Sequence, residues 1–155
     1  MVLGLDPGTV AFGYGCVDVE EPRFVTLRYV DCGVFGSSRK VNYARLVEIG
    51  RDLELVIDEL RPDAIAMEGG FTGRKSAALM IGAARGVAAY VAGRRGFEIR
   101  EYAPSTAKKM ATGNGKASKT QVAALVRARL KMKITPAEDA GDALAVAICR
   151  AFDRS

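Results

Sequence analysis

Four acidic residues occupy positions from which rigid elements could bring them to one point. Asp6 follows the apolar run VLGL, Glu68 follows DAIAM, and Asp139 and Asp142 lie near the start of the Ala-rich stretch DAGDALAVAI. The chain has no histidine, and carboxylate oxygens alone favour hard cations such as Mg²⁺ or Mn²⁺ over zinc. Two such ions, about 3.5–4 Å apart, commonly displace an oxygen of a phosphodiester. The pattern predicts a metal-dependent nuclease with these four catalytic metal ligands.

Local structural roles compete with this interpretation at two of the four positions. Asp6 precedes Pro7 and Gly8, where an aspartate often forms a turn. Asp139 could serve only to favour the start of a helix. An acid at the end of a buried strand is nevertheless costly unless it is paired or binds a metal. We therefore favour the functional role at all four positions.

Positive charge is concentrated in one stretch of the sequence. The net charge is +5, and residues 100–133 contain nine lysines and arginines against the single acid Glu101. A basic surface beside an acidic pocket suits an enzyme that cleaves a polyanion, although a solvated basic helix remains an alternative. Lys119 follows the predicted N-cap Ser118, where a cation opposes the helix dipole. This penalty favours a phosphate-facing, catalytic role for Lys119.

Several other residues are candidates for contacts with nucleic acid. Phe71 lies in a Gly-rich loop that suits a base-stacking aromatic better than a core residue. Lys108 and Lys109 would point in different directions on a helix, so that one of them could simply be solvated. For Arg74 and Lys75, the alternative is ordinary surface charge. The predicted DNA-binding residues are Phe71, Arg74, Lys75, Lys108, Lys109, Lys116 and Lys119.

Hydrophobic periodicity and turn residues predict an α/β domain. Gly8, Gly13, Gly15 and the stretch 20–22 punctuate the first strands, whose short connections favour antiparallel hairpins. Ser118 with Gln121 matches a capping box. The predicted strands are 2–5, 13–19, 24–31 with an extension at 33–35, 63–68 and 97–102; the predicted helices are 41–60, 76–95, 118–131 and one with Thr135 as N-cap and Pro136 as its first residue.

This order of elements predicts a five-stranded mixed sheet flanked by helices, in a single domain over residues 1–155. Cys16, Cys32 and Cys149 are too few and too scattered for a disulfide framework, so we expect reduced thiols in a cytoplasmic protein. The N-terminus lacks the pattern of a signal peptide. The apolar stretch 77–93 is too short for a membrane span and contains Arg85, so no membrane association is expected. Gly82 and Gly86 permit close helix packing, either in the core or between subunits.

Five ordered pieces of the sequence resemble the RuvC family of Holliday-junction resolvases, which have the ribonuclease-H-like fold. The pieces are LGLDPGT, the Glu that ends DAIAME, GAARGVAAYVA, EYAPSTAKKMATGNGKASKTQV and DAGDALAVAI. Each piece alone is weak evidence, since LGLDPGT also resembles the phosphate loop of actin-like kinases. All five in this order, over nearly the whole length, make the resemblance specific.

The resemblance implies a homodimeric endonuclease that nicks two strands of a four-way DNA junction symmetrically with Mg²⁺ or Mn²⁺. It implies metal ligation by Asp6, Glu68, Asp139 and Asp142, placement of Lys108 and Lys119 near the scissile phosphate, and base stacking by Phe71. Some family members carry a histidine beside the last aspartate; this chain has none, so the fourth ligand should be Asp139. Whether a branch-migration helicase is a partner is left open. The expected location is the nucleoid if the source is a cell, or the host cytoplasm if it is a virus.

Other functions fit the sequence less well. Actin-like kinases need two duplicated domains, which 155 residues cannot supply. A non-catalytic junction-binding module would be expected to lack one of the carboxylates, and all four are present. A broader branched-DNA or flap nuclease and an RNA-processing relative of the same fold remain open, because Gly69 and Gly70 after Glu68 indicate a more flexible loop than expected.

Overall fold

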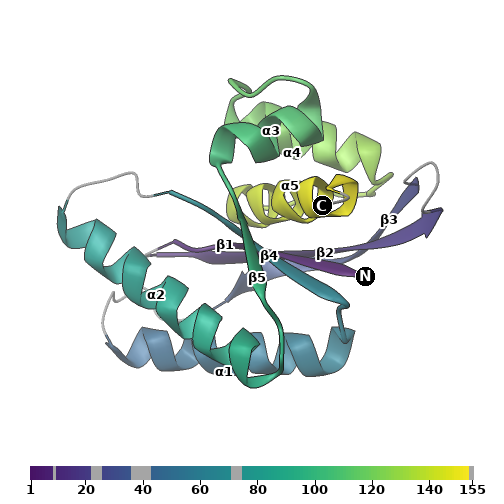
Figure 1. Ribbon diagram of the computed structural model, residues 1–155. Coiled ribbons are helices and arrows are strands. Elements are labelled where there is room, and N and C mark those ends of the chain that lie inside the picture. Colours follow the sequence, from purple (N-terminus) through teal and green to yellow (C-terminus); the bar gives the residue numbers. More distant parts are fainter. Residues whose placement is uncertain (9, 22–25, 36–42, 71–74, 154–155) are drawn as a thin grey trace.

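The computed structural model describes residues 1–8, 10–21, 26–35, 43–70 and 75–153. Within these ranges the chain forms five strands and five helices (Figure 1). They are β1 (Val2–Asp6), β2 (Phe12–Glu21), β3 (Thr26–Phe35), α1 (Tyr43–Leu60), β4 (Ala64–Glu68), α2 (Lys75–Arg94), β5 (Ile99–Tyr102), α3 (Pro104–Thr112), α4 (Lys119–Arg129) and α5 (Glu138–Phe152).

The strands form one mixed sheet in the order β3-β2-β1-β4-β5. β1 pairs antiparallel with β2, and β2 with β3, which confirms the predicted hairpins. On its other side β1 pairs in parallel with β4, and β4 with β5. The two parallel strands β1 and β4 therefore end side by side, at the same edge of the sheet.

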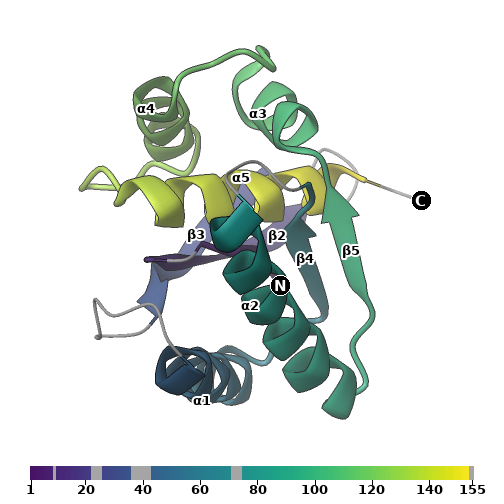
Figure 2. The same cartoon turned by 90° about the vertical axis from the view of Figure 1, so that its left-hand side faces the viewer.

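Helices cover both faces of the sheet, as two views at right angles show (Figures 1 and 2). α1 and α2 lie on one face, over a core that includes Leu3, Leu5 and Ile65. α5 crosses the opposite face of the sheet. α4 packs on α5 around Val122 and Leu144. No helix among the described residues is long and apolar enough to cross a membrane.

The close approach of α5 to the sheet depends on glycines in the first two strands. A Cβ atom on Gly4 would lie 2.1 Å from the Ala143 carbonyl oxygen, and one on Gly13 would lie 2.2 Å from the Asp139 carbonyl oxygen. Gly15 has the same role opposite Leu144. Gly13 and Gly15 lie inside β2, within the strand that was predicted over 13–19. They let the α5 backbone lie directly on the sheet.

The helices in the last third of the chain agree with the prediction in one respect and differ from it in two. The capping box is confirmed, because Ser118 Oγ accepts from the Gln121 N–H and the Gln121 side chain accepts from the Ser118 N–H. α3 was absent from the predicted order of elements. The predicted N-cap at Thr135 is wrong, since α5 begins at Glu138 with Ala137 as its N-cap and no side-chain cap.

Candidate active site

Strand alternation aims Asp6 and Glu68 at the same helix. In β1, Leu3 and Leu5 pack toward α1 and α2, so Asp6 faces α5 because successive side chains alternate between faces. In β4, Ile65 and Met67 likewise pack away from α5, which leaves Glu68 on the α5 side. Both acids are therefore held by rigid strand ends under the start of α5.

The start of α5 completes an acidic cleft of about 370 Å³. Asp139 and Asp142 lie in the first two turns of this helix, and Asp142 is buried with 5% of its surface exposed. The cleft is lined by the four predicted acids Asp6, Glu68, Asp139 and Asp142. It is also lined by the cations Arg85, Lys108 and Lys119. Residues that lie more than 130 positions apart in the sequence thus meet at one edge of the sheet.

The carboxylates repel one another in this partly buried cleft. Burial, together with the charges of Glu68, Asp142 and Asp139, raises the pKa of Asp6 from its usual 3.8 to about 8. Burial also raises the pKa values of Glu68 and Asp142, which Lys108 and Lys119 partly oppose. A cation is the ordinary means of relieving such a concentration of negative charge.

The donor set suits a hard cation, because all four candidate ligands are carboxylates. Within the described ranges, no group of three or more Asp, Glu, Cys or His side chains is already arranged as a metal site. The four carboxylates nevertheless line one cleft, where they are the candidate ligands.

Lys119 extends across the mouth of the cleft from the first position of α4. Its Nζ lies 3.0 Å from Glu138 Oε1, 3.6 Å from Asp142 Oδ2 and 3.9 Å from Asp139 Oδ1. Burial lowers the pKa of Lys119, but the hydrogen bond to Glu138 and the charges of Asp142 and Asp139 outweigh it, so that the net shift is upward. Lys119 is therefore a fixed positive charge beside the acids.

The other predicted DNA contacts do not all gather in this cleft. Lys109 and Lys116 are exposed and line a neighbouring cleft between α3 and the start of α4. Phe71 and Arg74 lie outside the described residues, and Lys75 is placed only as the first residue of α2.

The basic stretch 100–133 does not form one continuous surface. Arg100 pairs with Asp153 at 3.1 Å. Arg129 donates to the Met110 carbonyl oxygen at 3.0 Å and stacks on the Phe152 ring. Lys131 and Lys133 line a cleft beside β3, beyond the C-terminal end of α4. The stretch therefore divides between structural contacts, a distant surface and the region of the acidic cleft.

Sequence reasoning missed two charged residues of the cleft region. Arg85 was considered only as a charge within an apolar stretch, yet it is buried and contacts the strand end that carries Glu68. A lone arginine in an otherwise apolar helix is the signal that could have identified it. Glu138 was not among the predicted site residues, yet it makes the shortest ion pair with Lys119.

Asp6→Asn should stabilise the fold at alkaline pH in the presence of EDTA. The raised pKa of Asp6 means that the folded state binds more protons than the unfolded state between about pH 4 and pH 8, so this group makes stability fall as pH rises through that window. Removing the charge should raise the melting temperature at pH 8 by roughly 2–4 °C, which corresponds to about 1 kcal/mol. Thermal denaturation from pH 5 to pH 9 tests this. Parallel curves for both proteins would contradict it.

A five-stranded mixed sheet with acids from two adjacent parallel strand ends and a facing helix defines the chain as an α/β enzyme domain of the ribonuclease-H-like type. The family model described as crossover junction endodeoxyribonuclease RuvC matches residues 2–150. The chain therefore belongs to the RuvC family, as the resemblance indicated.

Individual relatives agree over nearly their full length. RuvC of Halorhodospira halophila is 42% identical over 99% of this chain and 91% of its own length, and RuvC of Protochlamydia amoebophila is 40% identical over 97% and 90%. The structure of Thermus thermophilus RuvC superposes with a TM-score of 0.84 at 32% identity, covering 97% of this chain and 93% of that one. The same protein in complex with a Holliday junction substrate gives a TM-score of 0.86 at 31% identity, covering 97% and 92%.

Proposed function

We propose that this chain is an endonuclease that resolves four-way (Holliday) junctions by paired symmetric nicks. The observation that carries the proposal is the meeting of four carboxylates and Lys119 in one cleft of a RuvC-family chain. The related Thermus thermophilus RuvC has been solved with a Holliday junction substrate, which supports branched DNA as the substrate class. We propose that residues 1–155 act as one nuclease domain, supported by the single sheet that the described helices cover directly or, for α3 and α4, through α5.

The RuvC family is a family of metal-dependent nucleases. We propose Mg²⁺ or Mn²⁺, two ions in each active site, with Asp6, Glu68, Asp139 and Asp142 as ligands. The all-carboxylate donor set and the raised pKa of Asp6 support this assignment. Ions held by these four residues would supply activation of a water nucleophile and charge stabilisation for the leaving oxygen.

The chain's own residues position the phosphate and screen its charge. Lys119 Nζ lies beside the acids, where its ammonium group can stabilise charge that develops on the phosphate. Lys108 lines the same cleft and lowers the pKa values of Glu68 and Asp142 through its charge, so it also acts on the ligand set. We propose that Lys109 and Lys116 bind neighbouring phosphates and that Arg74, Lys75 and the stacking residue Phe71 complete the DNA surface.

The outer face of α2 supports a two-fold homodimer. The outer stripe consists of Leu79, Ala83, Gly86, Tyr90 and Gly93, spaced three and four residues apart along the helix. Leu79 is 73% exposed and Tyr90 is 64% exposed, and a Cβ atom on Gly86 would meet open space. This unpartnered apolar face favours contact between subunits over core packing. A two-fold axis would present two identical cleft sites to a junction of matching symmetry.

Gly86→Glu should give a folded monomer that nicks only one strand at a time. The open space around Gly86 accommodates the new side chain within one subunit, whereas a charge in an apolar subunit contact is costly. Light scattering should show the mass halved, and a cruciform plasmid should yield open circles in place of linear product. Ala44→Glu, an equal charge change on the exposed part of α1, is the control. A wild-type monomer that linearises the plasmid in one binding event would contradict the dimer.

The substrate assignment is tested with a panel of four-way, flap, replication-fork and linear DNAs. The proposal expects paired nicks on the four-way junction in Mg²⁺ or Mn²⁺, with much slower cleavage of the other substrates. Comparable cleavage of flaps and forks would favour the second candidate, a broader branched-DNA nuclease. The Gly69–Gly70 pair after Glu68 favours that candidate, because it indicates a more flexible loop beside the site.

We propose a cytoplasmic location. The described residues contain three free cysteines, of which Cys16 and Cys149 are buried. Burial raises the pKa values of both thiols to about 11, so they stay protonated and unreactive. Reduced thiols of this kind are ordinary in a reducing compartment.

A further inference from the structure

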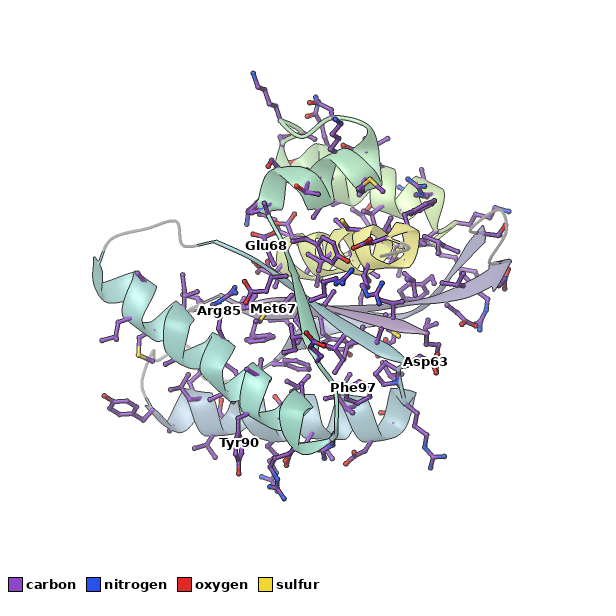
Figure 3. The ribbon with its side chains drawn as sticks, viewed as in Figure 1. Asp63, Met67, Glu68, Arg85, Tyr90 and Phe97 are labelled. Carbon is purple, nitrogen blue, oxygen red and sulfur yellow. The ribbon has the colours of Figure 1, made fainter. Side chains whose placement is uncertain are left out.

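A buried arginine of α2 holds the strand end that carries Glu68. Arg85 is only 8% exposed, and its Nη1 group donates a hydrogen bond to the Glu68 carbonyl oxygen. Its Nη2 group forms an ion pair with Glu101 Oε1 of β5 at 2.6 Å. Figure 3 shows the Arg85 side chain pointing from α2 toward Glu68, whereas Tyr90 of the same helix points away from the sheet.

The same strand end is also tied to the neighbouring strand. Met67 and Glu68 of β4 pair in parallel with Glu101 and Tyr102 of β5, and the Gly69 N–H donates to the Tyr102 carbonyl oxygen at 2.7 Å. The β1–β4 pairing stops one residue earlier, with Leu5 opposite Met67. The Glu68 carbonyl therefore lies where pairing with β1 has ended, and Arg85 supplies its donor there.

The two contacts of the Arg85 guanidinium differ in their exposure. Glu101 has a side chain that is 53% exposed, so solvent screens its ion pair with Arg85. The bond to the Glu68 carbonyl is more buried, and a charged donor there is roughly twice as strong as a neutral one. A fixed carbonyl group also fixes the Glu68 backbone. The Glu68 carboxylate can then move only by rotation about its side-chain torsions.

We propose that Arg85 is a positioning residue that sets Glu68 for metal binding. The inference rests on the proposed function, since it takes Glu68 as a metal ligand. Arg85 acts through the Glu68 backbone, because its guanidinium, although it lines the cleft, is buried and bonded to the Glu68 carbonyl oxygen. Groups that orient metal ligands in this way typically change metal affinity by about 10–100-fold when they are replaced.

The test compares Arg85→Met with Arg85→Lys and Glu101→Gln. Mn²⁺ binding is measured from the electron paramagnetic resonance signal of free Mn²⁺, and junction cleavage is measured over a Mn²⁺ series. Arg85→Met, which keeps the length of the side chain but loses the donors, should weaken Mn²⁺ binding about 10–100-fold. Added Mn²⁺ should restore cleavage. The loss of Mn²⁺ affinity should be smaller in Arg85→Lys. It should be smallest in Glu101→Gln, because the ion pair of Glu101 is exposed.

Arg95→Met is the matched control. Arg95 also pairs with two acids, Glu54 at 3.2 Å and Asp58 at 2.9 Å, but it follows the far end of α2. Its loss should leave Mn²⁺ affinity unchanged. Junction affinity in EDTA should also be unchanged in Arg85→Met, because Arg85 does not contact the DNA in this proposal.

Three results would overturn the inference. Unchanged Mn²⁺ affinity in Arg85→Met with a lower melting temperature would make Arg85 purely structural, and weaker junction binding in EDTA would make it a phosphate contact. If Arg85→Met does not fold, a loss of Mn²⁺ affinity in Arg85→Lys that is no larger than the loss in Glu101→Gln would overturn it equally. Failure of the proposed function looks different: the wild-type protein itself would neither bind Mn²⁺ nor cleave junctions.

Discussion

Asp6→Asn should reduce junction cleavage by at least about 10³-fold, because the charge stabilisation that metal ions supply is worth several kcal/mol and about 4 kcal/mol corresponds to this factor in rate. Asparagine keeps the size of the side chain but removes the charge that holds a cation. Asp142→Asn and Glu68→Gln should behave alike, since all three acids face the same cleft. Single-turnover cleavage of a labelled four-way junction in Mg²⁺ measures the effect.

Junction binding should persist or strengthen in these variants. Each substitution removes negative charge from a cleft that the proposal places against phosphates, so electrostatic repulsion of DNA decreases. The expected higher stability of Asp6→Asn at pH 8 separates lost catalysis from lost folding. Asp58→Asn, on the exposed surface of α1, is the control and should cleave normally. Retained nicking by Asp6→Asn in Mg²⁺ would remove Asp6 from the set of metal ligands.

Junction affinity should fall by about 10³–10⁵ between 50 and 200 mM salt, as expected for roughly 6–10 phosphate contacts. The proposed dimer supplies contacts in this range, because each subunit places four lysines in or beside the acidic cleft. These are Lys108, Lys109, Lys116 and Lys119. Fluorescence anisotropy of a labelled junction in EDTA, over a salt series, measures the slope of the log–log plot.

Replacing lysines in pairs locates these contacts. Removing Lys109 and Lys116 together should reduce the slope by about 0.9 for each phosphate that the protein no longer neutralises. The matched pair Lys131 and Lys133 removes the same charge from beyond the far end of α4, which is about 16 Å long at 1.5 Å per residue, and should change the slope little. An equal decrease of the slope in both double variants would show instead that DNA binding is spread over the whole basic stretch.

Lys119→Ala separates catalysis from binding at the cleft. Its cleavage rate should fall more than its junction affinity, because the ammonium group lies within 3.6 Å of Asp142 and near the proposed reacting phosphate. Equal losses in rate and affinity would make Lys119 an ordinary phosphate contact.

The sequence by itself determined the elements that carry the acids. Apolar runs of four or five residues that stop at Asp6 and Glu68, bounded by Pro and Gly, indicate short buried strands, and their ends are where acids become tolerable. The capping box at Ser118 is a local hydrogen-bond pattern within four residues, so the start of α4 was also predictable. The hairpins followed from short connections.

Other features of the site depend on contacts between residues far apart in the sequence. The strand order that places β1 beside β4, and so Asp6 beside Glu68, is a property of the whole sheet. Gly13 and Gly15 were interpreted only as residues that punctuate the strands, because the local pattern cannot show that α5 will lie against them. The start of α5 was misplaced because Thr135 and Pro136 match a cap sequence two residues earlier.

Only the tertiary structure decided which charges act at the site. Along the sequence, nine basic residues lie in one stretch. In the fold, Arg100 and Arg129 make structural contacts, and Lys131 and Lys133 line a different cleft. The fold likewise turns Arg85 inward to Glu68 while its neighbour Gly86 faces outward. Charge interactions depend on distance in space and on burial, and neither is a function of separation along the chain.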